Sequence, residues 1–273
     1  MDSRTLAAAR ARNSARQDGG DQSMATYALV VLIIVFFLTS VVGVVTGSNS
    51  LIAVPVMFQF GIDPKVAVAT NMFGLVFMAV GGTIPFLRQG KIEFKRISPL
   101  IALTIGGSAL GAGIVGLITG DSIKLIVSIA MIVVVMFTLL KPRSGTEKVE
   151  SISSKATMVT FVLTFLLGIY GGLYSGGYVT ILTATLVAFF GMTYSEAVAN
   201  TKLINVFSSL IATAVFMWQG LVDYKLGLIL GVTMFVGAYA GAHFVTKLNE
   251  IWLRRIFLTT VLLLAIKTLY DFI

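Results

Sequence analysis

The feature that most constrains this sequence is a series of apolar stretches, each about twenty residues long. A helix needs roughly 20 apolar residues to cross the hydrocarbon core of a bilayer. Of the 273 residues, 57% are hydrophobic and 12% are charged, whereas a soluble domain carries about 25% charged residues. These values predict a polytopic membrane protein. The stretches that we expect to span lie at 24–45, 63–87, 97–118, 122–140, 156–173, 194–218, 226–245 and 251–272.

Two further apolar stretches, 51–60 and 179–190, are too short to cross a bilayer. Each follows a polar or glycine-rich break, at residues 46–50 in the first case and 170–178 in the second. Glycine and small polar residues interrupt helices. The predicted fold class is therefore an all-α polytopic membrane protein with two homologous halves, about eight spanning helices and two short broken or re-entrant helices.

The second half of the chain repeats the first at a shift of 130 residues. Such a constant shift is not expected from apolar composition alone. The matched pairs include Gly61 and Gly191, Gly90 and Gly220, Gly107 and Gly237, and Gly111 and Gly241. The match divides the chain into a cytoplasmic tail at 1–23, a first transmembrane repeat at 24–140, a charged linker at 141–155 and a second transmembrane repeat at 156–273.

Several helix starts carry capping signals. Asp63 precedes Pro64, which is the N-cap and N1 pattern of a helix start. Thr193 and Glu196 have the spacing of a capping box. We expect Asp121 to cap the stretch that begins at 122.

The basic residues predict the orientation of the chain, because Lys and Arg favour the cytoplasmic side. If the two short stretches dip into the membrane and return, the tail, the 88–96 loop and the 141–155 linker share one side. We then expect both termini in the cytoplasm, in the inner membrane, and repeats that run parallel; inverted repeats are the alternative. The residues on that side would be Arg4, Arg10, Arg12, Arg16, Arg88, Lys91, Lys95, Arg96, Lys141, Arg143, Lys148 and Lys155.

Composition also argues against several classes of function. The chain has no Cys and one His, and no carboxylate falls in the middle of an expected span, so we expect neither an enzyme, a metal site nor a cofactor. The net charge of +8 is explained by the loops of a membrane protein rather than by nucleic-acid binding. Cation transporters and proton relays place acids within the membrane, so the substrate is expected to be a small anion.

Lys202 is the one basic residue that lies deep in an expected span, and such a charge points to a functional site. The two short helices would direct their N-termini, which carry partial positive charge, toward the same depth. We therefore expect a substrate site formed by Lys202, Asn200, Thr201, Asn205, Gly176, Gly177, Tyr178, Ser175, Gly47, Asn49, Ser50, Thr70 and Asn71.

Structural roles compete with this interpretation. Lysine side chains can extend to the membrane surface, and Tyr178 could be a packing aromatic. Glycines in membrane helices often permit close packing instead of binding, and this applies most to Gly107, Gly111, Gly237 and Gly241.

At these residues the chain resembles the sulfite exporter TauE/SafE family, over roughly residues 25–272. The resemblance rests on Gly43 and Gly47, on Gly172, Gly176 and Gly177, on the run from Ala197 to Lys202, and on the Gly-Ala pattern at 237–242. It implies export of sulfite, sulfoacetate or related sulfonates across the inner membrane. In this family the first-half break usually holds more glycine; Ser48, Asn49 and Ser50 stand there instead, which suggests a retuned specificity.

The residue chemistry by itself indicates only an anion. An anion channel, a permease for a non-sulfur carboxylate, and a membrane scaffold or assembly factor are therefore alternatives. The expected partners are the small anion and the lipid bilayer, and a homodimer is left open.

Overall fold

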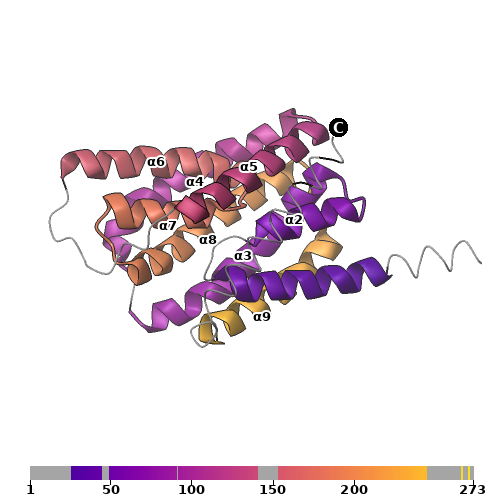
Figure 1. Cartoon of the computed structure of the whole chain (residues 1–273), viewed down its shortest axis with the longest axis horizontal. Helices are drawn as coiled ribbons and strands as arrows, with labels where there is room; N and C mark the ends of the chain where they lie inside the picture. Colours follow the sequence, from indigo (N-terminus) through magenta and orange to yellow (C-terminus); the bar gives the residue numbers. More distant parts are fainter. Residues whose placement is uncertain are drawn as a thin grey trace, which may run out of the picture.

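The computed structural model describes residues 26–44, 49–90, 92–140 and 153–244, together with Ile266 and Tyr270. Within these ranges the fold is entirely helical, as Figure 1 shows. The N-terminal helix, Thr26–Val44, precedes eight labelled helices. These are α2 (Ser50–Gln59), α3 (Pro64–Arg88), α4 (Phe94–Leu117), α5 (Gly120–Leu140), α6 (Ser154–Leu173), α7 (Tyr178–Phe189), α8 (Tyr194–Trp218) and α9 (Tyr224–Phe244).

Six of the described helices are long and apolar enough to cross a membrane: the N-terminal helix, α3, α4, α6, α8 and α9. The multi-pass, all-α prediction is therefore confirmed for this part of the chain. α5 has 21 residues and coincides with another expected span, although some of its side chains lie outside the described residues. The two short helices, α2 and α7, lie where the sequence placed them. The stretch 251–272 is outside the described residues except for Ile266 and Tyr270.

Local sequence sets most of the helix starts. The Asp63 side chain accepts hydrogen bonds from the N–H groups of Lys65 and Val66, and Thr193 with Glu196 forms the expected capping box. The prediction for Asp121 is wrong. Thr119 is the capping residue there, because its hydroxyl oxygen accepts from the N–H of Ser122 at 3.2 Å.

Helices from the two halves of the chain pack closely against each other at glycine residues. α4 packs closely against α6, where a Cβ added to Gly111 would lie 1.9 Å from the carbonyl oxygen of Ile169. α9 packs in the same way on the N-terminal helix, where a Cβ added to Gly241 would lie 2.3 Å from the carbonyl oxygen of Val41. Gly107 and Gly237 make the corresponding contacts one turn earlier. The packing interpretation of these four glycines is confirmed.

The helix contacts define two ends of the bundle. At the first end, the ammonium group of Lys65 at the start of α3 donates to the carbonyl oxygen of Gly116 at the end of α4. The side chain of Gln219, just after α8, donates to the carbonyl oxygen of Ala112 near the same end of α4. α3 therefore starts where α8 stops, and these two 25-residue helices run in opposite directions.

The N-terminal helix also begins at the first end. Its residues Ala28 and Leu29 line a groove with Ile62 and Asp223. The turn before α4 lies at the second end, about 36 Å from the first for the 24 residues of α4. There the N–H of Glu93 donates to the side chain of Asn200 near the start of α8. Figure 1 agrees, with the N-terminal helix entering from one side and the start of α6 on the other.

Of the basic residues in the orientation argument, the described residues Arg88, Lys95 and Arg96 lie at the second end, opposite the start of the N-terminal helix. The expected grouping required the start of the N-terminal helix and the 88–96 loop to lie at one end, whereas Ala28 and Phe60 line one groove at the first end and α3 alone then runs to the second end. α3 and α8, which the shift of 130 residues pairs with each other, run in opposite directions, whereas parallel repeats were expected.

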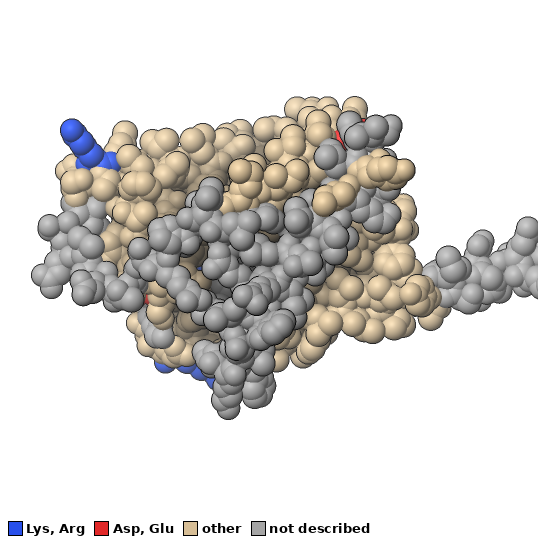
Figure 2. All heavy atoms as spheres, viewed as in Figure 1, with Lys and Arg blue, Asp and Glu red and all other residues tan. Residues whose placement is uncertain are grey.

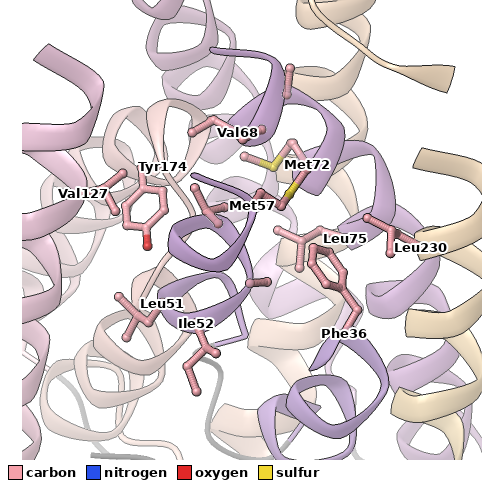
Figure 3. Packing of buried hydrophobic residues seen from close by; sticks show 14 of the residues in the cluster. Phe36, Leu51, Ile52, Met57, Val68, Met72, Leu75, Val127, Tyr174 and Leu230 are labelled. Carbon is pink, nitrogen blue, oxygen red and sulfur yellow. The ribbon is translucent and has the colours of Figure 1, made fainter. Parts of the chain in front are cut away.

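Apolar side chains form the interior and also much of the exterior. The main core joins the N-terminal helix, α2, α3, α5 and α9, and Figure 3 shows Leu51, Met57 and Met72 within it. A second cluster joins α4, α7 and α8. Outward positions such as Leu110, Val133 and Leu166 are more than half exposed, as expected for surfaces that face lipid. Among the described residues drawn in Figure 2, Lys and Arg atoms are visible toward the edges of this face.

Candidate functional site

A small cavity lies inside the bundle where the two helix breaks meet. The residues that line it come from the end of the N-terminal helix, from the starts of α2 and α7, and from the middle of α3 and α8. The lining residues are Gly43, Asn49, Ser50, Leu75, Met78, Ala79, Ser175, Val179, Lys202 and Asn205.

Lys202 provides the charge in this cavity. Its side chain is only 3% exposed, and its ammonium nitrogen donates to the carbonyl oxygen of Gly43 at 3.3 Å. That carbonyl belongs to the last described turn of the N-terminal helix. Among the described residues, Lys202 is the only charged side chain that is buried, and none of the ion pairs found there involves it. The cavity therefore has an excess of positive charge.

The start of α2 adds polar groups beside that charge. Asn49 is the N-cap residue, and its carbonyl oxygen accepts from the N–H groups of Ile52 and Ala53 at 3.1 Å each. Its side chain does not cap the helix, and its Oδ1 and Nδ2 atoms are both buried without a partner among the described residues. Buried amide atoms in this state carry a cost of about 1–3 kcal/mol each, so Asn49 is available to a ligand.

A chain of hydrogen bonds joins the two breaks. The Oγ atoms of Ser50 and Ser175 lie 2.7 Å apart. The Nδ2 of Asn71 donates to Ser50 Oγ at 2.8 Å, and the hydroxyl of Tyr174 donates to the carbonyl oxygen of Ser50 at 2.9 Å. Figure 3 shows Tyr174 beside α2, near Leu51. Residues before α7 thus hold the start of α2 in place.

Two of the expected site residues have structural partners elsewhere. The Oδ1 of Asn200 accepts from the N–H of Glu93, and its Nδ2 donates to the carbonyl oxygen of Glu196. The hydroxyl oxygen of Thr70 accepts from the N–H of Asp223 at the start of α9. Neither residue lines the cavity. Backbone N–H groups at the start of a helix lack helical partners. The side chains of Asn200 and Thr70 accept hydrogen bonds from such groups at the starts of α4 and α9.

The remaining expected residues that the structure describes do not line the cavity. Gly177 is the N-cap of α7 with a φ of +80°, a conformation that favours glycine, and the carbonyl oxygen of Gly176 accepts from Tyr170. Tyr178 and Thr201 are fully buried. Gly47 lies outside the described residues.

Sequence reasoning placed Lys202, Asn205, Asn49, Ser50 and Ser175 at the site, and all five line the cavity. It did not include Gly43, although that residue opens the glycine pattern of the first break. Sequence reasoning could not identify the apolar lining residues, because apolar side chains occur throughout a membrane helix. These residues are Leu75, Met78, Ala79 and Val179. Among the described residues there is no cluster of His, Cys, Asp or Glu that could hold a metal ion.

The arrangement suits an anion. The N-termini of α2 and α7 carry partial positive charge toward the cavity, and the lysine and hydroxyl groups supply donors. The sequence model of the family described as sulfite exporter TauE/SafE matches residues 32–268 of the chain. The chain belongs to the sulfite exporter TauE/SafE family.

Several members of this family are similar along nearly their whole length. A probable membrane transporter protein, ORF9, from Sinorhizobium sp is 27% identical over 92% of this chain and 95% of its own. A probable membrane transporter protein from Haemophilus influenzae is 25% identical over 89% of this chain and 95% of its own. The Escherichia coli K12 protein YfcA, also a probable membrane transporter, is 25% identical over 89% and 90%. No solved structure matches the chain.

Membership of the TauE/SafE family confirms the resemblance found in the sequence. Together with the multi-pass helical fold it identifies the chain as a membrane transporter.

Proposed function

We propose that this transporter is a secondary transporter that exports small sulfur oxyanions or organosulfonates, of the sulfite and sulfoacetate type, across the inner membrane. The observation that carries the proposal is the buried ammonium group of Lys202, which donates to a backbone carbonyl and has no carboxylate partner in the described part of the chain. A buried charge in this position is poorly compensated, and a bound anion restores the balance.

The same cavity holds donors of the kind that tetrahedral oxyanions require. Ser50, Ser175 and the amide group of Asn49 lie along its wall, and a sulfonate has three oxygens that each accept hydrogen bonds. Bonds between a charged donor and an anion contribute about 1.5–3 kcal/mol each. A membrane scaffold requires neither a buried lysine nor a polar cavity, which favours transport over that alternative.

The helix arrangement supports transport by alternating access. α3 and α8 have equal lengths and opposite directions, and the cavity lies where α2 and α7 begin. Transporters built from inverted repeats bind substrate at such broken helices and move one repeat against the other. We infer that the two halves are inverted repeats around one central site, in a bilayer and without a further obligatory partner. A homodimer remains a prediction.

A flux assay tests the proposal. Purified protein is reconstituted into liposomes that are loaded in turn with sulfite, sulfoacetate, taurine, sulfate or acetate, and efflux is measured with and without a pH gradient. The expected result is saturable efflux of sulfite or sulfoacetate that Lys202→Met abolishes and that Lys225→Ala, an exposed lysine outside the cavity, preserves.

Efflux of acetate alone would point to a carboxylate permease. Flux that does not saturate would point to a channel, and absence of flux for all five anions would contradict the proposal.

A further inference from the structure

Asn71 is next to the cavity without lining it, and it makes one hydrogen bond to a lining residue, Ser50. Its Nδ2 donates to Ser50 Oγ, while its Oδ1 has no partner among the described residues. Asn71 itself is 2% exposed and does not line the cavity. Any influence of this residue on a bound anion therefore passes through Ser50.

The hydrogen bond from Asn71 limits which further hydrogen bonds the hydroxyl groups of Ser50 and Ser175 can make. Each hydroxyl has one O–H donor and two lone pairs. The bond between Ser50 and Ser175 uses one O–H group, and Asn71 occupies a lone pair of Ser50 without accepting a hydrogen. The second O–H group of the pair thus has no acceptor among the described residues, and both serines line the cavity.

We propose that Asn71 is a positioning residue which makes the Ser50–Ser175 pair a hydrogen-bond donor to the anion, so that the site favours oxyanions whose oxygens carry no proton. The inference rests on the proposed function. An oxygen without a proton accepts strongly from the free O–H group, whereas a protonated ligand oxygen is a weaker acceptor for that group. Sites built to match a hydrogen-bonding group discriminate strongly against a ligand that mismatches it.

Two anions of the same shape separate this effect from charge. Methanesulfonate has three accepting oxygens, and methylphosphonate, at a pH where it is a monoanion, has one oxygen that carries a proton. Dissociation constants of both are measured by isothermal titration with the purified full-length protein. The expected wild-type result is tighter binding of methanesulfonate.

The test variant is Asn71→Asp, because a carboxylate accepts the O–H group of Ser50 and Ser175 then donates to Ser50. The pair is left with lone pairs only. The preference for methanesulfonate should fall about tenfold or more, the effect of one mismatched buried hydrogen bond. Since both probes are monoanions, the added negative charge weakens both and cancels in the ratio. Asn71→Leu, a neutral variant of similar size, frees a lone pair on Ser50 and should shift the ratio the same way, but less.

The Ser50→Ala background shows whether Asn71 acts through Ser50. In that background Asn71→Asp should leave the ratio unchanged, as a double-mutant cycle requires of residues that act as a unit. Ser128→Ala, which removes a buried hydroxyl bonded only within α5, should keep the wild-type ratio.

Two results overturn the inference alone: a ratio unchanged in both Asn71 variants while Lys202→Met weakens binding of both probes, or an equal shift in the Ser50→Ala background. A different result would overturn the proposed function as well: dissociation constants for both probes that are the same in the wild-type protein and in Lys202→Met.

Discussion

Ser50 Oγ and Ser175 Oγ lie 2.7 Å apart, although 125 residues separate them in the chain. Ser50 opens α2 and Ser175 precedes α7, so this contact brings the two helix breaks together inside the bundle. A hydrogen bond of this kind contributes only about 0.5–1.5 kcal/mol. Its significance is geometric, because it places two helix N-termini and Lys202 around one cavity.

Cross-linking tests that contact. The chain contains no cysteine, so Ser50→Cys with Ser175→Cys introduces the only thiols. Side-chain oxygens 2.7 Å apart imply Cβ atoms close to the separation of about 3.5–4.5 Å that a disulfide needs. We expect a disulfide on mild oxidation, which keeps the two halves joined after cleavage at a protease site inserted in the 141–155 linker. Each single-cysteine variant is the control and should separate into two fragments; separation of the double variant would contradict the contact.

Removal of the Lys202 charge should weaken anion binding. Loss of one charge-assisted bond corresponds to about 1.5–3 kcal/mol, so Lys202→Ala should raise the dissociation constant for sulfite or sulfoacetate roughly ten- to a hundredfold, measured by titration. Lys202→Arg keeps the charge but changes the geometry of the donors, so we expect a smaller loss. An alanine variant that folds normally and binds with unchanged affinity would show that the anion site lies elsewhere.

The two ends of the bundle should face opposite sides of the membrane. The N-terminal helix starts at the same end as α3, whereas the turn before α4 and the start of α6 lie at the other end. Reporter fusions at the N-terminus and after Lys148 should therefore give opposite signals, one cytoplasmic and one external. Equal signals at the two positions would contradict this arrangement.

Glycine contacts between α4 and α6 should be necessary for stability. A Cβ at Gly111 would lie 1.9 Å from the carbonyl oxygen of Ile169, whereas a Cβ at Gly113 would meet nothing within 4 Å. Gly111→Ala should lower the thermal unfolding temperature in detergent, since overpacking costs about 1–3 kcal/mol or more. Gly113→Ala in the same helix should leave that temperature unchanged or raise it slightly. Equal unfolding temperatures for the two variants would show that α4 and α6 pack differently.

The sequence alone was sufficient to predict the features of the fold that depend on residues close together in the chain. Helix bounds followed from apolar stretches of spanning length, the starts of α3 and α8 followed from their capping residues, and the breaks before α2 and α7 followed from glycine and polar residues. The depth of Lys202 could be predicted in the same way. These features are local because backbone hydrogen bonds in a membrane helix are made within a few residues of each other.

Only the tertiary structure decided which of those residues meet. Asn200 stands two positions from Lys202 in the sequence, yet its side chain binds the backbone at Glu93 while Lys202 reaches Gly43. Neighbours on a helix point in different directions because each residue turns the helix by about 100°. The antiparallel course of α3 and α8 was likewise decided only by the tertiary structure, because contacts between distant helices determine it, such as those of Lys65 and Gln219 with the end of α4.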